Sequence, residues 1–154
     1  MKELSSKVAT TALTAAIYAM TTVVLGQLSY SWIQVRISEV LTPLPFLMGF
    51  PVVFGLTLGC VLANLFSPVG VPDMIFGPLL TLLAAFLSWK VNFGKKVVAC
   101  IYPVLINAFG VSAYIYSFYR VPYLVSVVTI AVGEFIAAVL VGYPLLTSIE
   151  KIFK

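Results

Sequence analysis

The chain has 154 residues, of which 62% are hydrophobic and 9% are charged, and its formal net charge is +4. A soluble core cannot hide this much apolar surface, so the composition predicts a membrane protein. The basic residues lie between apolar segments and form no basic face on a soluble fold, which argues against a nucleic-acid partner. We expect one domain over residues 1–154.

Charged residues separate apolar stretches of roughly 17 to 25 residues, a length that suits one crossing of a hydrocarbon core about 30 Å thick. The first expected helix covers about residues 8–28, after a short amphipathic start at residues 1–7. Its apolar segment is too long for a signal-peptide core and lacks a convincing cleavage site. We therefore expect this helix to be retained.

The uncharged stretch between Glu39 and Asp73 is too long for one span, and Pro43, Pro45, Pro51 and Gly49 interrupt it. Such residues end helices and mark turns. The pattern predicts two short helices, at about residues 38–49 and 52–66, joined by a tight turn at Phe50 and Pro51.

Three further apolar stretches predict helices at about residues 74–89, 97–114 and 123–147. The expected fold class is therefore an all-α integral membrane protein, a bundle of six transmembrane helices.

The distribution of lysines predicts the topology, because cytoplasmic loops carry an excess of basic residues. With six crossings, seven of the nine basic residues share one side, namely Lys2, Lys7, Lys90, Lys95, Lys96, Lys151 and Lys154. Arg36 and Arg120 lie on the other side. We expect a multi-pass protein of the cell membrane with both termini in the cytoplasm.

The side chains that most enzymes need are missing. The chain has no histidine, and Cys60 and Cys100 fall separately inside predicted helices, where a thiol acts as a small apolar filler. Isolated carboxylates and cysteines do not make a metal site, and no glycine-rich phosphate loop occurs. The sequence predicts no catalytic residue, no cofactor and no ATP hydrolysis of its own, so binding or transport fits better than catalysis.

Glu134 lies near the middle of the last predicted helix, about 18 Å from its start at 1.5 Å per residue. A carboxylate at that depth is costly in lipid and is a candidate functional group. Its neighbours Gly133, Ala137 and Ala138 are small and leave space for something to approach. The alternative is a protonated glutamate bonded to a neighbouring helix.

The segment WIQVRISE, residues 32–39, concentrates polar groups at the outer mouth of the predicted bundle. Gln34, Arg36 and Glu39 are candidates for binding a ligand. In the alternative interpretation, Ser38 caps the second helix and Arg36 pairs with Glu39 at i, i+3 spacing.

Two amides lie deep in predicted helices, Asn64 in the third and Asn107 in the fifth. Each supplies hydrogen-bond donors and acceptors for a ligand, or bonds another helix, an effect of about 0.6 kcal/mol in membranes. Trp32 belongs to an outer group of aromatic residues, mostly interfacial anchors, of which one or two could stack on a planar ligand.

Small residues recur four positions apart in the first helix, at Ala12 and Ala16 and at Ala15 and Ala19. Such faces let another helix approach closely, either inside the bundle or on a different protein. Gly55 and Gly59 repeat the spacing in the third helix, where we expect internal packing.

The stretch WIQVRISEVLTPLPF, residues 32–46, resembles the QueT family of queuosine-precursor transporters. These proteins are substrate-binding (S) subunits of energy-coupling-factor (ECF) transporters. GLTLGCVLANLFSP (55–68), DMIFGPLLTLLAAFLSWK (73–90), YPVLINAFG (102–110) and GEFIAAVLVGYPLL (133–146) extend the similarity over nearly the whole chain.

The resemblance implies a six-helix subunit that presents substrate to a transmembrane coupling subunit powered by two ATPase subunits. In that superfamily an alanine-x-x-x-alanine surface on the first helix contacts the coupling subunit, and Ala12, Ala16 and Ala19 match it. The implied substrate is a deazaguanine precursor of queuosine, as the aminomethyl base, the cyano base or queuine.

The polar residues are compatible with such a ligand, because one carboxylate can accept two adjacent N–H groups of a guanine-like edge. An aminomethyl cation would need a second carboxylate, and Glu39 and Glu134 could fill both roles. The remaining candidates for hydrogen bonds to the other ring atoms are Asn107, Asn64, Gln34 and Arg36. Another planar vitamin-like cargo and a stand-alone proton-coupled carrier remain as alternatives.

Overall fold

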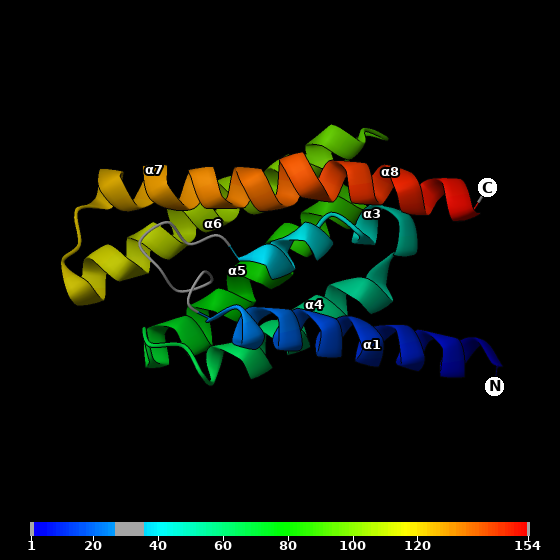
Figure 1. Cartoon of the computed structure of the whole chain (residues 1–154), viewed down its shortest axis with the longest axis horizontal. Helices are drawn as coiled ribbons and strands as arrows, with labels where there is room; N and C mark the ends of the chain where they lie inside the picture. The colour runs from blue at the N-terminus through cyan, green and yellow to red at the C-terminus, as the bar shows by residue number, and fades with distance from the viewer. Residues whose placement is uncertain (1, 27–35, 154) are drawn as a thin grey trace.

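The computed structural model describes residues 2–26 and 36–153, with side chains for residues 3–26 and 36–152. These residues form helices and connecting turns, and no strand occurs among them (Figure 1). The elements in chain order are α1 (Lys2–Val24), η1 (Ile37–Leu41), α3 (Pro45–Met48), α4 (Phe50–Asn64), α5 (Val71–Lys90), α6 (Lys96–Tyr119), α7 (Tyr123–Glu134), η2 (Phe135–Val141) and α8 (Gly142–Phe153).

Six helical segments follow one another, as predicted, because η1 and α3 share the second segment and α7, η2 and α8 join into the sixth. Within the described residues, four segments are long and apolar enough to cross a membrane: Glu3–Val24, Val71–Lys90, Lys96–Tyr119 and Tyr123–Ile152. The segments Ile37–Met48 and Phe50–Asn64 are apolar but shorter. The fold is therefore an all-helical bundle with four long and two short apolar segments.

The second segment is not the single α-helix that was expected. It begins as the 3₁₀-helix η1, passes through a turn and ends as the single α-helical turn α3. The chain reverses at Gly49, whose φ of 73° lies in the region that favours glycine. Phe50 and Pro51 already belong to the first turn of α4, where a proline costs no helical hydrogen bond.

Helices α1 and α4 pack closely because two glycines of α4 face α1. A Cβ atom on Gly59 would lie 2.8 Å from the carbonyl oxygen of Ala15, and one on Gly55 would lie 2.7 Å from that of Thr11. Contacts this short leave no room for a side chain. The prediction that Gly55 and Gly59 serve internal packing is thus confirmed.

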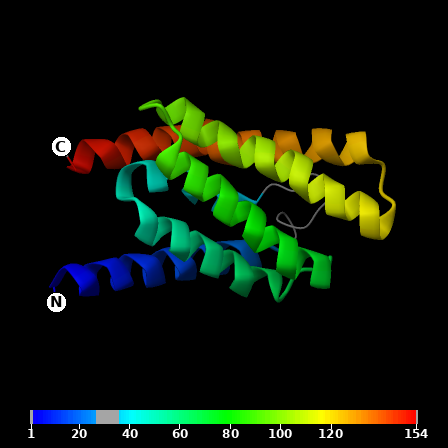
Figure 2. The same ribbon diagram turned by 180° about the vertical axis from the view of Figure 1, so that it is seen from behind.

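The two chain termini lie at the same end of the bundle, on the right in Figure 1 and on the left when the molecule is seen from behind in Figure 2. The loop between α5 and α6 belongs to that end too, because Lys96 forms an ion pair with Glu150 near the C-terminus. The turn between α3 and α4 also reaches it, since the rings of Phe50 and Trp89 are 5.6 Å apart. This lysine-rich end is opposite the α6–α7 turn at Arg120 (Figure 1).

We expect Gly59→Ala to destabilise the protein by about 1–3 kcal/mol, because the added methyl group meets the backbone of α1 and forces the two helices apart. The midpoint of thermal unfolding in detergent should fall by several degrees. Val61→Ile adds the same single carbon to an exposed position of α4 and should leave the midpoint unchanged. Equal midpoints for both variants would contradict the packing argument.

Candidate functional site

The interior of this apolar protein holds a group of buried polar side chains around η1. In both views η1 and α3 run through the middle of the bundle, between α1 and the helix formed by α7, η2 and α8 (Figures 1 and 2). η1 contacts α1, η2 and α8. Its polar residues therefore face several helices at once.

Glu39 of η1 is completely buried, and both of its carboxylate oxygens accept hydrogen bonds. The hydroxyl of Tyr18, on α1, donates to Oε1, and the hydroxyl of Thr42 donates to Oε2 over 2.5 Å. Hydrogen-bond donors of this kind stabilise a carboxylate away from water. Glu39 is thus held in one orientation by α1 and by the turn that follows η1.

Arg36 precedes η1 and forms a buried ion pair with Asp73 of α5, with Nη2 3.0 Å from Oδ2. This ion pair is formed with Asp73, not with the Glu39 of the alternative interpretation. Asp73 also accepts a hydrogen bond from the hydroxyl of Tyr114, on α6. The ion pair ties the chain before η1 to the start of α5 and the end of α6.

The predicted capping role of Ser38 is wrong. Arg36 occupies the capping position of η1 without a side-chain hydrogen bond. The Ser38 hydroxyl instead accepts a hydrogen bond of 2.7 Å from Thr22, so it joins η1 to α1. The 3₁₀ geometry explains the difference, because η1 is too short and too tightly wound to need an α-helical cap.

Asn64 ends α4 and is fully buried against the start of α5. Its Nδ2 donates to the backbone carbonyl of Asp73 over 2.8 Å, while its Oδ1 is buried without a partner in the described part of the chain. Gly77 makes this contact possible, because a Cβ atom there would lie 2.2 Å from Nδ2 of Asn64. The amide therefore bonds a neighbouring helix and keeps one acceptor open.

Asn107 and Glu134 form the other polar pair of the interior. Nδ2 of Asn107, on α6, donates to Oε1 of Glu134 over 2.9 Å. Glu134 is 3% exposed, and among the described residues its Oε2 has no hydrogen-bond partner. η2, which begins directly after Glu134, contacts η1, so this pair lies close to the element that carries Glu39.

The helix of Glu134 changes its winding immediately after this residue, where α7 passes into the π-helix η2. π-Helical turns inside α-helices often occur at functional sites. The small residues expected to leave space near Glu134 are buried by the bundle itself: Ala137 is 2% exposed and Ala138 is fully covered. Their small side chains thus allow close packing around the carboxylate.

The structure brings most of the predicted site residues into one interior. Glu39 and Arg36 lie at η1, which contacts η2 beside Glu134. Asn107 donates a hydrogen bond to Glu134, and Asn64 donates one to the backbone of Asp73. Gln34 and Trp32 lie outside the described residues. That any of these residues binds a ligand remains a prediction.

Asp73 is the residue that sequence reasoning missed. It is completely buried although it occupies the first turn of α5. One signal was available: Asp73 is the one aspartate in the chain and begins an apolar helix nine residues after Asn64. Because Asp73 lies near the expected outer mouth of the bundle, the sequence could have predicted that it pairs with Arg36.

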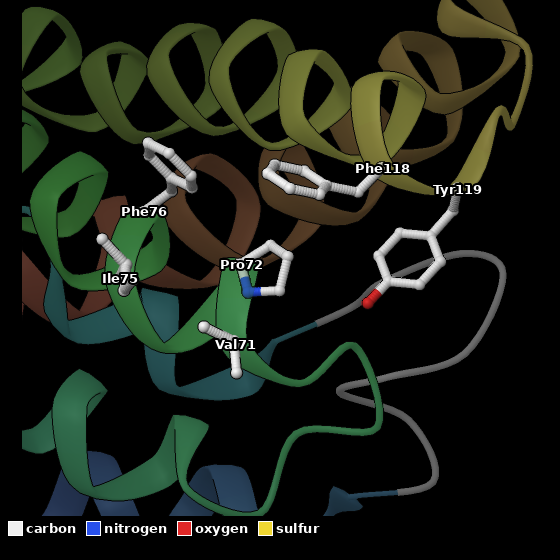
Figure 3. Close-up of a pocket in the computed structure, with 6 residues that line it drawn as sticks. All are labelled: Val71, Pro72, Ile75, Phe76, Phe118 and Tyr119. Atoms are coloured by element: carbon white, nitrogen blue, oxygen red, sulfur yellow. The ribbon is translucent and has the colours of Figure 1, made fainter.

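A separate hollow of about 430 Å³ lies on the surface between the start of α5 and the end of α6. Figure 3 shows Pro72, Phe76 and Phe118 around it, with Tyr119 at its rim. The hydroxyl of Tyr119 donates to the carbonyl of Val69. This lining offers few hydrogen-bonding groups, so the hollow is poorly suited to a polar planar base.

The comparison with protein families identifies the family of this protein. The model of the QueT transporter family matches residues 8–151. The chain belongs to the QueT transporter family. Its matched region includes Arg36, Glu39, Asn107 and Glu134, and the family places it among transport proteins rather than enzymes. No curated protein and no solved structure matches this QueT transporter.

We expect Asp73→Asn to destabilise this QueT protein by about 3–5 kcal/mol, because it leaves the buried guanidinium of Arg36 without its counter-ion. Thermal unfolding in detergent measures the loss, and adding Arg36→Met should restore part of it. Glu3→Gln removes the acid of the exposed Glu3–Lys7 pair and should leave the midpoint of unfolding nearly unchanged. An Asp73→Asn protein as stable as Glu3→Gln would contradict a structural role for the ion pair.

Proposed function

We propose that this QueT protein is the substrate-binding S subunit of an ECF importer in the cell membrane. It captures a queuosine precursor, a deazaguanine base or queuine, from outside the cell. A transmembrane coupling subunit and two ATPase subunits complete the importer and supply the energy. Membership in the QueT family supports the proposal at the level of transport.

One observation carries the choice of a polar planar cargo: the buried polar residues converge around η1 instead of facing separate neighbours. Arg36 and Glu39 lie at η1, which contacts η2 directly after Glu134, and among the described residues Oε2 of Glu134 has no hydrogen-bond partner. A guanine-like base carries adjacent N–H donors and a carbonyl acceptor, which carboxylates and amides can match. Asn107 and Asn64 would form hydrogen bonds with the remaining polar groups of the base.

The lysine-rich end of the bundle would lie in the cytoplasm, following the positive-inside rule. Lys7, Lys95 and Lys96 belong to this end, as do both termini (Figure 1). Arg36, Asp73 and Tyr114 would then lie toward the outside, where the substrate arrives. This topology matches the one expected from the sequence.

The outward face of α1 supports docking to the coupling subunit. Ala12 and Ala16 are exposed, while Ala15 packs against α4 and Ala19 is half-buried. An apolar groove of about 400 Å³ runs beside Ala12, between α1 and α4. Small exposed residues let a partner helix approach closely in a membrane.

The purified protein should bind deazaguanine precursors of queuosine and unfold at a higher temperature in their presence. A ligand at 100 times its Kd stabilises the native state by about 2.7 kcal/mol through mass action. A thermal-shift screen of the aminomethyl base, the cyano base and queuine, with riboflavin, thiamine and biotin as controls, measures this. Stabilisation by a vitamin alone would favour the alternative of another planar cargo.

We expect Ala16→Leu to abolish ATP-dependent uptake in the reconstituted importer and to leave ligand binding intact, because the larger side chain keeps the partner helix away. Ala113→Leu is the matched control, an exposed alanine on α6, which packs against α5 and α7. It should transport normally. Normal uptake by Ala16→Leu would reject α1 as the contact surface.

A proton-coupled carrier is the second candidate, because Glu134 is a buried carboxyl group with an open oxygen near the middle of the sixth segment. Vesicles that contain this chain alone distinguish the two mechanisms. Uptake driven by a pH gradient without any ATPase subunit would favour the carrier and reject the importer.

A further inference from the structure

The turn between α5 and α6 exposes basic and apolar side chains next to one another. It covers residues 90–97 and lies at the end of the bundle that carries both termini (Figure 2). Apart from Gly94, its exposed residues belong to these two kinds, namely Lys90 and Lys95, and Val91, Phe93 and Val97. Both neighbouring helices are long and apolar enough to cross a membrane, so the turn lies where two spans leave the hydrocarbon.

Phe93, at the tip of the turn, has an unfavourable backbone conformation. Its φ of 51° lies in the left-handed region, where a bulky residue is an outlier. Its side chain is 77% exposed, so packing within the chain does little to offset this cost. Residues held in such conformations often have a function, which makes the ring of Phe93 a candidate for a contact outside the chain.

The side chain of Asn92 holds this conformation in place. Its Nδ2 donates to the backbone carbonyl oxygens of Ser88 and Trp89, over 3.0 and 2.8 Å. Its Oδ1 accepts a hydrogen bond of 2.9 Å from the backbone N–H of Gly94. These bonds connect the last turn of α5 to both sides of Phe93, so the ring is presented in a defined direction.

The two exposed lysines of the turn have no acidic partner close to them in the sequence. No acidic residue occurs between Asp73 and Glu134. Lys90 and Lys95 form no ion pair with another described residue. The ammonium group of Lys90 instead lies 4.0 Å from the centre of the Trp89 ring. Both charges are therefore available to an anionic partner.

We propose that the turn of residues 90–97 binds the headgroups of anionic phospholipids at the membrane surface. Lys90 and Lys95 donate hydrogen bonds to lipid phosphates, and the ring of Phe93 inserts between the headgroups. A bilayer surface places anionic groups directly beside apolar ones, which matches the adjacent basic and apolar side chains of the turn. The site does not depend on the cargo or on the partner subunits of the importer.

The experiment measures lipid binding to the purified full-length protein in detergent by native mass spectrometry. Phosphatidylglycerol is compared with phosphatidylcholine of the same acyl chains, and the wild-type protein should bind the anionic lipid about tenfold more tightly. Lys90→Gln combined with Lys95→Gln should reduce this ratio to about twofold. Lys7→Gln combined with Lys151→Gln is the matched control, because it removes two exposed lysines from the same end, and should retain the preference.

Phe93→Gly separates the lipid contact from a role in folding. Glycine adopts a positive φ without strain, so the variant should unfold in detergent at a temperature no lower than the wild type. It should nevertheless bind phosphatidylglycerol about threefold more weakly, because the ring at the interface is lost. Lower stability with unchanged lipid binding would show that the ring serves the fold and would overturn the assigned contact.

Equal wild-type affinities for the two lipids would reject the proposal. So would an equal loss of preference in both double variants, since the lysine-rich end as a whole would then attract the lipid. Inorganic phosphate added at constant ionic strength should not displace phosphatidylglycerol, and displacement would show that the turn takes a free anion instead. If the variant of Lys90 and Lys95 keeps its lipid preference but no longer assembles with the coupling subunit, the turn is a protein contact and the lipid assignment is wrong.

Discussion

A carboxylate buried among apolar side chains needs a counter-ion or hydrogen-bond donors, and this requirement organises the interior of the protein. Asp73 meets it with Arg36 and with the hydroxyl of Tyr114. These contacts hold together the chain before η1, the first turn of α5 and the last part of α6. Because Arg36 directly precedes η1, the ion pair also fixes where η1 and its residue Glu39 begin.

The packing of α1 separates two roles on opposite faces of one helix. Its inner face carries Ala15 and Tyr18, which lie so close to Gly59 of α4 that a Cβ atom there would be 2.8 Å from each of them. The hydroxyl of Tyr18 also reaches Glu39, so this face contributes to the polar interior as well as to packing. The outer face presents Ala12 and Ala16 and is free to meet another helix. A partner could therefore dock without disturbing the contacts that orient Glu39.

The last helical segment links the polar interior to the backbone of η1. Its winding changes to a π-helix directly after Glu134, and Gly142 follows that stretch. A Cβ atom on Gly142 would lie 3.2 Å from the carbonyl oxygen of Val40, so the two segments touch through their backbones. The absence of a side chain at Gly142 thus allows the sixth segment to approach η1 closely.

The sequence by itself determined the six helical segments and the distribution of lysines, because apolar length and the spacing of charges are properties of the chain alone. It also indicated Glu134 and Asn107, since polar groups are conspicuous in apolar helices. Only the tertiary structure decided that Arg36 pairs with Asp73 and that Ser38 accepts a bond from Thr22. Local spacing allowed an Arg36–Glu39 pair as an alternative, but Asp73, 37 residues away in the sequence, meets Arg36 once the helices pack. Which oxygen of Glu134 is bonded by Asn107 likewise follows from contacts between helices.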